Sequence, residues 1–438
     1  MILILISVVL AIGTSCQKKD SAPDEDNETG NAENAVNTSA LEGFWDGSIK
    51  IPNQPLHIIV SFQDHDTLSG DISIPIQGVD EHPFSSIEKD DGSIVFTMEI
   101  GGQSMTFNGE ASDDKIEGTF TQAGQTFPFE LDKKEQTATG DEEGEFLTVD
   151  TEEGTLQGEL KTPDGDGPYP VMIIIPGSGL TDRNGNTIAG DNNSLKMVAE
   201  ILAENGIASV RYDKRGAGKN KDAITAEEDM RFDQFIDDAL HWVDLLSADD
   251  QFTGIGIIGH SQGSLVGMVA AQDDKVDTFV SVAGAGSPID EVMLQQLKGQ
   301  LPDNLLAETK EILKELKKGG QVENVSQALQ SEFRPSVQPF LSSWMEYDPA
   351  DEIQKLDIPT LIINGTRDLQ VTKEEADKLH AAKSDAELLI VDKMNHVLKE
   401  APEDKGKNME TYWDPDLPLA DGLMDGMLDF LDGVHFEK

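Results

Sequence analysis

The chain has 438 residues, of which 33 are basic and 83 are acidic, so its formal net charge is −50. This length favours two domains, and the 37% of hydrophobic residues is enough to give each domain a core. Nucleic acid is excluded as an expected partner, because phosphate binding requires a basic patch that this composition does not supply. The acidity indicates a solvated surface and favours neutral or cationic substrates over anionic ones.

The N-terminus combines an apolar run with the one cysteine of the chain, which excludes an intramolecular disulfide. Residues 1–15 are too short to span a bilayer comfortably, since a spanning helix needs roughly 20 residues. The run ends in small residues before Cys16, and this resembles a bacterial lipoprotein signal, in which cleavage leaves a lipid-modified cysteine. The resemblance implies a signal peptide over 1–15 and a lipid-anchored protein of the bacterial cell envelope, outside the cytoplasm. Ordinary secretion and a cytosolic protein with a fortuitous apolar end are the alternatives.

Residues 16–40 and 41–133 have different compositions. The first segment is acidic and polar with almost nothing large and apolar, which predicts a disordered tether. The second contains short alternating runs such as LHIIVSF, SIVFTMEI and FPFELD, separated by Gly, Asp and Asn, and it predicts an all-β meander closed as a small barrel or sandwich. Its histidines, His57, His65 and His82, match no zinc spacing, and we interpret them as surface or packing residues. Residues 134–150 are acidic again and form the predicted linker.

From residue 151 to 438, apolar strands alternate with helical stretches. We expect strands at 171–176, 207–212, 254–259, 278–284, 360–365 and 387–392, with helices at 194–206, 232–246, 373–383, 418–433 and directly after Ser261. This alternation predicts a doubly wound, mostly parallel α/β sheet that helices cover on both faces. Residues 285–350 interrupt the rhythm with helical segments that follow the end of a strand, so we expect them to form a cap over the ligand-binding edge.

The segment Gly259-His260-Ser261-Gln262-Gly263 follows a predicted buried strand and precedes a helical stretch rich in small residues. A sharp turn from strand to helix strains the backbone of its central residue, and flanking glycines relieve the clash. This context resembles the nucleophile elbow of the α/β-hydrolase superfamily. The likeness covers about residues 146–438 and is nearest to bacterial serine esterases.

The chain order of that family places an acid and then a histidine after the nucleophile, each beyond a strand end. Asp368 follows the strand at 360–365, and His396 follows the strand at 387–392. The resemblance therefore implies a catalytic triad of Ser261, Asp368 and His396. The alternatives are a turn residue for Ser261, a helix N-cap for Asp368 and a surface position for His396.

An ester hydrolase also requires N–H donors for the oxyanion. In this family they come from the residue after the nucleophile and from the loop after the third strand. The resemblance assigns them to the backbone N–H groups of Gln262 and Ser178, with Gly179 as an alternative to Ser178.

Two neighbouring motifs have competing interpretations. The spacing of Asp182, Asn184 and Asn186 suggests a calcium loop, but the glycine and terminal glutamate of an EF-hand are missing, so we expect neither a metal nor a cofactor. Residues 211–220, RYDKRGAGKN, lack the full phosphate-loop pattern and match a structural turn that the family has after its fourth strand. The remaining histidines, His241, His260, His380 and His435, are interpreted as packing or structural residues.

These features favour a serine carboxylesterase that hydrolyses a small, neutral ester through an acyl-enzyme intermediate. A serine peptidase or an acyl-thioester hydrolase of the same fold is the alternative, since one triad serves all three. A lipoprotein with an inert hydrolase domain that binds a surface polymer is the alternative from another class. The oligomeric state has no signal in the sequence.

Overall fold

The computed structural model describes residues 41–51, 56–64, 68–74, 79–90, 92–100, 103–112, 114–134, 144–187, 190–298 and 301–436. The predicted signal peptide, Cys16 and the predicted tether lie outside these residues, as does His65. The chain divides near residue 140 into two compact units, which are described separately below.

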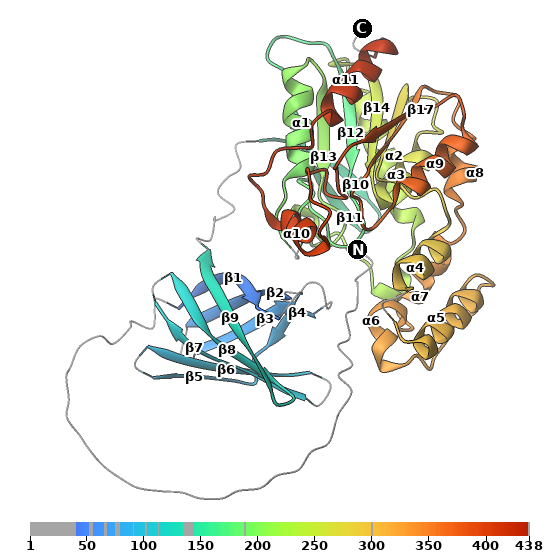
Figure 1. Ribbon diagram of the computed structural model, residues 1–438. Coiled ribbons are helices and arrows are strands. Elements are labelled where there is room, and N and C mark those ends of the chain that lie inside the picture. Colours follow the sequence, from blue (N-terminus) through green and yellow to red (C-terminus); the bar gives the residue numbers. More distant parts are fainter. Residues whose placement is uncertain are drawn as a thin grey trace, which may run out of the picture. The chain divides into compact units, whose positions relative to one another are not determined.

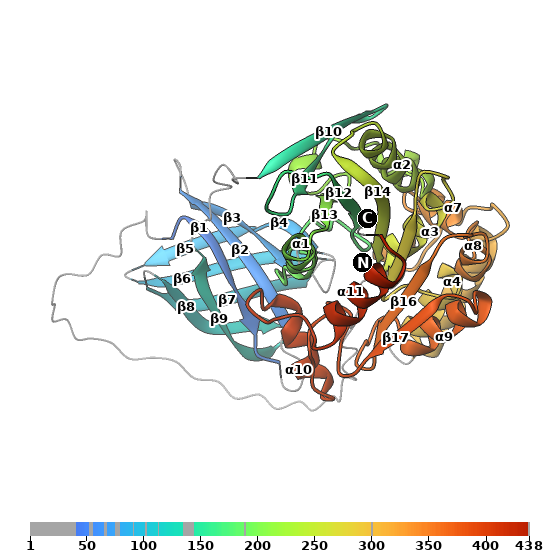
Figure 2. The same ribbon diagram turned by 90° about the horizontal axis from the view of Figure 1, so that it is seen from above.

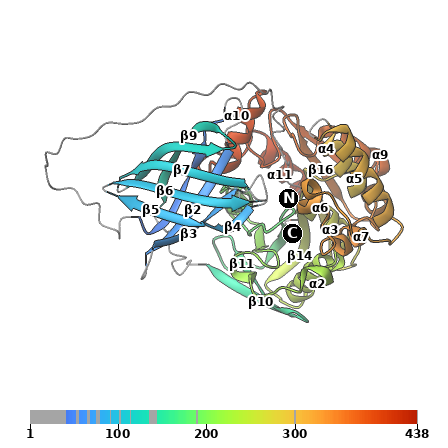
Figure 3. The ribbon, with the colours of Figure 1, turned by 90° about the horizontal axis from the view of Figure 1, so that it is seen from below.

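The first unit, the β domain, is one antiparallel sheet of nine strands. The strands are β1 (Gly43–Ile49), β2 (Leu56–Asp64), β3 (Leu68–Ile74), β4 (Val79–Pro83), β5 (Ser86–Asp90), β6 (Ser93–Ile100), β7 (Gln103–Ala111), β8 (Lys115–Gln122) and β9 (Gln125–Lys134). Their order in the sheet is β4-β3-β2-β1-β9-β8-β7-β6-β5. Consecutive strands pair from β1 to β4 and from β5 to β9, β1 pairs with β9, and the consecutive strands β4 and β5 lie at the two ends of the order. The sheet curls into a half-barrel (Figures 1 and 3), and the predicted all-β character is confirmed.

The concave core of the β domain follows from the alternation of its strands. Along β6, for example, Ile94, Phe96 and Met98 are fully buried, and the residues between them are not. Phe96 stacks on Phe107 with ring centroids 4.7 Å apart. The sequence patterns missed β3, β4, β5 and β8, because these strands are short or carry many polar residues and two of them lie at the sheet edge.

The second unit, the α/β domain, contains a sheet of eight strands. They are β10 (Glu145–Thr151), β11 (Gly154–Lys161), β12 (Tyr169–Ile175), β13 (Ala208–Tyr212), β14 (Phe252–His260), β15 (Thr278–Val282), β16 (Thr360–Gly365) and β17 (Glu387–Val391). Their order is β10-β11-β13-β12-β14-β15-β16-β17. The hairpin β10–β11 is antiparallel and β13 through β17 are parallel, which confirms the predicted α/β-hydrolase fold. The strand β10 begins inside the predicted linker 134–150, because its polar sequence carries little apolar signal.

The helices of this sheet are α1 (Ser194–Glu204), α2 (Asp233–Ser247), α3 (Gln262–Ala270), α9 (Lys373–Ala382) and α11 (Leu423–Gly433). Two cores share the strand β12: Ile173 belongs to the core with α2, α3 and α9, and Ile174 belongs to the core with α1 and α11. Figure 2 shows α1 and α11 on one face of the sheet and α2, α3 and α9 on the other. Alternate side chains of a buried strand thus face two helical layers, as the continuous apolar runs predict.

Between β15 and β16 the chain forms the predicted helical insertion, which we call the cap. It contains α4 (Ile289–Leu297), α5 (Asp303–Leu316), α6 (Gln330–Phe333), α7 (Gln338–Trp344) and α8 (Pro349–Ile353). In Figures 1 and 3 the helices α4 to α7 group together at one end of the sheet. The cap leaves the carboxyl end of β15 and returns before β16, so it lies next to the edge at which the parallel strands end.

The segment after β17 contains a helix that the sequence patterns did not predict, α10 (Lys405–Glu410), followed by a 3₁₀ turn over Thr411–Trp413. Other 3₁₀ turns cover Gly218–Asn220, Glu227–Asp229 and Gln327–Leu329. Among the helices in the described part of the chain, none has the length and apolar composition that crossing a membrane requires.

Candidate active site

Ser261 lies between the end of β14 and the start of α3, in a turn that only small neighbours permit. Its backbone angles are φ 55° and ψ −117°, which are strained for a residue with a side chain. A Cβ at Gly259 would lie 2.3 Å from the carbonyl oxygen of Gly263, and a Cβ at Gly263 would lie 2.4 Å from that of Ile175. The two glycines of the motif therefore let β14, α3 and the end of β12 approach closely, and this approach leaves the hydroxyl of Ser261 half-exposed.

The structure brings the three predicted triad residues together. His396 Nε2 is 3.0 Å from Ser261 Oγ, and His396 Nδ1 is 2.8 Å from Asp368 Oδ2. His396 and Asp368 are 5% and 6% exposed, so the contact between them is buried, whereas the contact of His396 with Ser261 is partly exposed. Since the carboxylate can only accept, Nδ1 carries the proton and Nε2 is left to accept the hydrogen of the serine hydroxyl.

Asp368 is held by its own loop rather than by the helix that follows. Its Oδ1 accepts the backbone N–H groups of Gln370 and Val371, at 2.8 and 2.9 Å. The N-cap residue of α9 is Thr372, and the amides that Asp368 binds precede it. The helix N-cap alternative for Asp368 is therefore not what the structure shows, and Oδ2 is left for His396.

The two predicted oxyanion donors line the same pocket as Ser261. Ser178 belongs to the loop after β12, and Gln262 is the first residue of α3. Within the described residues, neither of their backbone N–H groups donates a hydrogen bond to another protein group. Gly179, the alternative donor, has a φ of 80° and shapes the turn after Ser178.

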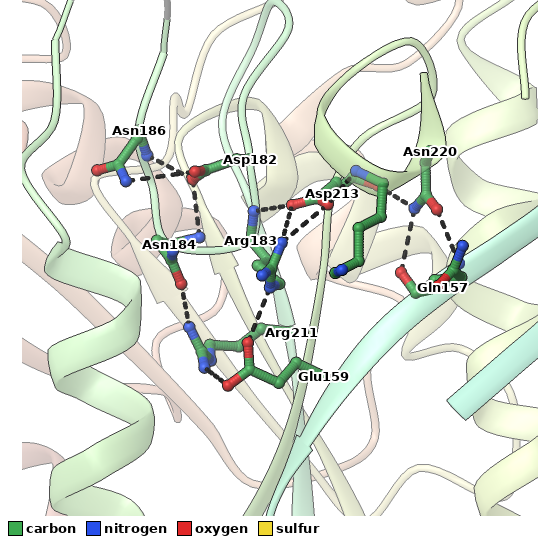
Figure 4. Close-up of polar contacts among 10 residues, drawn as sticks. Gln157, Glu159, Asp182, Arg183, Asn184, Asn186, Arg211, Asp213 and Asn220 are labelled. Carbon is green, nitrogen blue, oxygen red and sulfur yellow. Dashed lines mark hydrogen bonds and ion pairs between the residues drawn. The ribbon is translucent and has the colours of Figure 1, made fainter. Parts of the chain in front are cut away.

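The loop that carries Ser178 is anchored by a buried network of charged and amide side chains, which Figure 4 shows. Arg183 donates to Asp213 at 3.0 Å and to Glu159 at 2.8 Å. Arg211 donates to Glu159 at 2.7 Å and also to Asn184. These contacts join the loop after β12 to the strand β11 and to the strand β13 and its following turn, so the oxyanion loop is tied to the sheet on two sides.

Asp182 organises the same loop from within. Its Oδ1 accepts the N–H groups of Asn184 and Asn186, each at 2.8 Å, and its Oδ2 accepts the side-chain amide of Asn186 (Figure 4). Burial raises the pKa of Asp182 to about 6, and the nearby charge of Asp213 adds to this. Among the described residues, no group of three or more His, Cys, Asp or Glu side chains is arranged to hold a metal ion.

The segment 211–220 forms a turn that serves this network. The carboxylate of Asp213 accepts the backbone N–H groups of Arg183 and Lys219, at 2.8 and 2.7 Å. Gly218 has a φ of 46°, and a Cβ there would lie 2.4 Å from the Asp213 carboxylate. The turn therefore needs a glycine at this position, and four of its charged residues, Arg211, Asp213, Lys214 and Arg215, are buried.

Three sets of residues around the site make contacts that the sequence patterns did not predict. The first is His260, which the sequence analysis interprets as a packing or structural residue and whose Nε2 donates to the main-chain oxygen of His396 at 2.8 Å. Burial lowers the pKa of His260 to about 4, and proximity to His396 lowers it further. A neutral His260 thus holds the loop that carries His396.

The second set supports the loop of His396 from behind. The side-chain amide of Asn395 donates to Thr411 Oγ1 at 2.7 Å and to Asn408 Oδ1 at 3.1 Å. Asn408 in turn donates to the main-chain oxygen of Arg367 at 2.9 Å, next to Asp368. The unpredicted segment of α10 and its 3₁₀ turn therefore ties the histidine loop to the acid loop.

The third is Lys214, two residues beyond the end of β13. It is 6% exposed, and burial lowers its pKa to about 7, although Asp238 opposes this shift. The sequence did not predict a role for Lys214, because the stretch RYDKRG is typical of a turn.

The pocket beside Ser261 is narrow and mostly apolar. Its cavity volume is about 50 Å³, and the cap contributes Ile289, Val292 and Trp344 to its wall. Its apolar wall is completed by Leu265, Ala285, Pro349 and Val371, and its polar lining by Ser178, Ser261, Gln262, Ser287, Gln296 and Gln370. No Asp, Glu, Lys or Arg is among the described residues that line it.

The other described histidines are not among the residues that line this pocket. His57 contacts Asp46 at 2.8 Å and His82 contacts the main-chain oxygen of Glu99 at 3.0 Å, both in the β domain. His241 and His380 lie in α2 and α9, and His435 follows α11.

Comparison with known proteins finds a match to one family model and a similar esterase. Residues 192–402 match the family model described as serine aminopeptidase, S33. The chain is 30% identical over 255 residues to the esterase EstD of Thermotoga maritima, an alignment that covers 56% of this chain and 58% of that protein. The chain therefore spans less than two thirds of the length of this curated relative.

Solved structures include similar chains at lower identity. One is Est1E from Butyrivibrio proteoclasticus with ferulic acid bound, at 19% identity and a TM-score of 0.44, covering 65% of this chain and 99% of that one. Another is the esterase Pf2001 of Pyrococcus furiosus, at 16% identity and a TM-score of 0.42, covering 66% and 92%. The order of the strands and the turn at Ser261, together with the family match, identify residues 144–436 as a domain with the α/β-hydrolase fold.

Proposed function

We propose that this chain is a serine hydrolase that cleaves small, neutral carboxylic esters. The observation that carries the proposal is the continuous hydrogen-bonded line from Asp368 through His396 to Ser261, with links of 2.8 and 3.0 Å. It ends at a strained turn, next to the residues Ser178 and Gln262, whose N–H groups have no acceptor among the described protein groups. Similarity to an esterase over 255 residues supports the same reaction class.

The geometry accounts for each proton of the reaction. His396 Nε2 takes the proton of Ser261 while Oγ bonds to the acyl carbon, and the carbonyl oxygen becomes an oxyanion facing Ser178 and Gln262. The imidazolium then protonates the departing alcohol, and the acyl group stays on Oγ. Water attacks this ester with His396 again as base, which releases the acid and restores Ser261. Asp368 keeps the proton on Nδ1 throughout.

The second candidate is an aminopeptidase, which the description of the matching family favours. Such an enzyme needs an anionic group to bind the free ammonium of its substrate. The described lining of the pocket is neutral, with apolar side chains from α3, the cap and the loop after β16. The lining therefore favours an uncharged acyl group, and the small volume of the pocket favours a short one.

The experiment compares p-nitrophenyl acetate, butyrate and octanoate with alanine p-nitroanilide and an acyl thioester, using the full-length chain. We expect turnover of the short esters, and Ser261→Ala should lower kcat by roughly 10⁴ to 10⁶-fold. The matched control is Ser264→Ala, one turn along α3, where a buried serine contacts Ser281. Turnover of the amide alone would assign the site to a peptidase. A folded chain that cleaves none of these would favour the surface-binding alternative.

We also propose that Cys16 carries a lipid anchor that holds the protein in the cell envelope. The support is the sequence resemblance to a lipoprotein signal. Metabolic labelling with a fatty acid analogue tests it in cells that express the full-length chain. Label should be incorporated in the wild type and lost in Cys16→Ser, and equal labelling of the two chains would contradict the anchor.

A further inference from the structure

Lys214 is a buried lysine that the triad mechanism does not use. Its Nζ donates to the main-chain oxygen of Gly177 at 3.1 Å and to the side-chain amide oxygen of Gln262. It also lies 4.1 Å from the ring centroid of Phe235 on α2. Among the described residues Lys214 forms no ion pair, so its ammonium is committed to neutral partners next to Ser261.

The carbonyl that Lys214 binds belongs to the same peptide group as the N–H of Ser178. In a trans peptide the C=O and the N–H point in opposite directions, so a donor on the oxygen orients the N–H on the other side. Hydrogen bonds in a chain polarise one another, and a cation on the carbonyl makes the N–H a stronger donor. The contact at Gly177 therefore acts on one predicted oxyanion donor.

The second contact acts on the other donor. Gln262 supplies its backbone N–H to the pocket, and its side-chain oxygen accepts from the same ammonium. Gln262 is 6% exposed, so its contact with Lys214 lies in the protein interior. One buried lysine thus joins the two residues that face the developing oxyanion.

The position of Lys214 is set by the network of Figure 4 rather than by its own flexible stem. Its backbone N–H donates to the main-chain oxygen of Thr181 at 3.1 Å. Its neighbour Asp213 accepts two hydrogen bonds from the side chain of Arg183, at 3.0 and 3.1 Å. The turn that carries Lys214 and the loop that carries Gly177 are therefore joined at two further points, Thr181 and Arg183.

We propose that Lys214 is a positioning residue for the oxyanion hole, which orients and polarises the Gly177–Ser178 peptide and holds Gln262 beside it. This inference rests on the proposed function. A purely structural role, in which the lysine only packs over Phe235, predicts a loss of stability and no selective effect on the transition state.

The test compares Lys214→Met with the wild type, in the full-length chain, on the best short ester. Removing a whole oxyanion donor costs about 10² to 10³-fold in kcat, so misplacing both donors should lower kcat by about 10 to 100-fold and change KM by less than about threefold. A trifluoromethyl ketone provides the second readout. Ser261 Oγ adds to its carbonyl carbon, the hydroxyl proton moves to His396, and the ketone oxygen becomes the oxyanion. Its inhibition constant should rise by the factor by which kcat/KM falls.

Chemical rescue distinguishes the effect of the Lys214 ammonium from the packing of its aliphatic side chain. Lys214→Cys treated with bromoethylamine regains an ammonium on a stem of nearly lysine length, and most of the lost kcat should return. The only other thiol, Cys16, is present in the treated wild type as well, which controls for its modification. The matched control is Lys383→Met, which removes another buried ammonium that donates to a main-chain oxygen, that of Leu356 at 2.8 Å. It should leave kcat unchanged.

A folded Lys214→Met chain with kcat and inhibitor affinity within twofold of the wild type overturns the inference. If that variant does not fold, Gln262→Leu tests the same contact while leaving the lysine over Phe235. It should lower kcat and inhibitor affinity together by about 3 to 10-fold, and no change would again overturn the inference. The rate at which a fluorophosphonate labels Ser261 can replace ester turnover. A wild type that is labelled but cleaves no ester would refute the ester substrate while the effect of Lys214 is still measured.

Discussion

The β domain and the α/β domain both have apolar cores, but they differ in how many polar and charged residues they bury. Among the described residues of the β domain, Ser61 is the only buried polar residue. The α/β domain buries Arg183, Arg211, Asp213 and Lys214, together with Asp368 and His396 of the triad. A sheet that uses only side-chain alternation needs no buried charge, whereas these charges sit where strands end and loops must be held.

The buried charges of the α/β domain carry an energetic cost that the β domain avoids. Burying a charge is unfavourable unless partners compensate for it, and replacing buried ion pairs by apolar residues is often neutral or stabilising. The charges of the α/β domain are therefore poorly explained by stability alone. They surround the loops of Ser178 and Ser261, which the proposed reaction requires to be rigid.

The largest expected effect follows from changing one charge of the triad. Asp368→Asn keeps the volume of the side chain but can donate to His396, which favours the wrong tautomer. We expect kcat to fall by about 10⁴-fold, measured on the best short ester. The control is Asp392→Asn, an exposed carboxylate just beyond β17 that contacts Thr366. An Asp368→Asn variant within tenfold of the wild type would contradict the assignment of the acid.

Breaking a buried ion pair of the α/β domain should have the next largest effect. Asp238 accepts two hydrogen bonds from Arg215, at 2.6 and 2.7 Å, and both side chains are almost fully buried. Asp238→Asn leaves the guanidinium with only one carboxylate partner, Glu153. We expect the free energy of unfolding to fall by about 3 kcal/mol in urea titrations. A loss below about 1 kcal/mol would mean that burial does not distinguish this pair from a surface pair.

The pH dependence of stability should reveal His260. Because its pKa is about 4 in the folded chain and about 6.5 when unfolded, the unfolded state binds the proton more tightly. The stabilisation of the folded state by neutral His260 is complete above about pH 6.5. It is lost as the pH falls towards 4, by about 3 kcal/mol in total. His260→Gln keeps a donor for the His396 carbonyl but cannot titrate. Urea titrations from pH 4 to 7 should therefore show that the free energy of unfolding changes less steeply with pH in the variant. Parallel pH dependences of the wild type and the variant would refute the lowered pKa of His260.

The smallest effect is expected at an exposed ion pair of the β domain. Lys50 contacts Glu130 at 2.7 Å, and the side chains are 49% and 34% exposed. Lys50→Met should change the free energy of unfolding by less than about 1 kcal/mol, because water screens the pair and solvates the remaining charge. A loss as large as that expected for Asp238→Asn would erase the contrast between the two domains.

Much of the candidate site could be predicted because its signals are local. The glycines of the motif from Gly259 to Gly263 indicate a tight turn, because they allow backbone segments to approach closely. Asp368 and His396 each follow an apolar strand. Lys214 and Asn408 carry no such signal. Lys214 appears in a stretch that reads as a turn, and Asn408 belongs to a polar segment whose helix has no apolar period.

The sequence by itself determined the alternation of strands and helices and the place of the cap, since each depends on neighbours within a few positions. Resemblance to a known motif and its chain order pointed to Ser261, Asp368 and His396 as the predicted triad. The tertiary structure alone decided that Lys214 contacts Gly177 and Gln262, 37 and 48 residues away along the chain. It also decided that Asn408 links the acid loop to the histidine loop. The physical reason is that these contacts exist only after parallel strands have brought their carboxyl ends to one edge of the sheet, and no local pattern records which loops meet there.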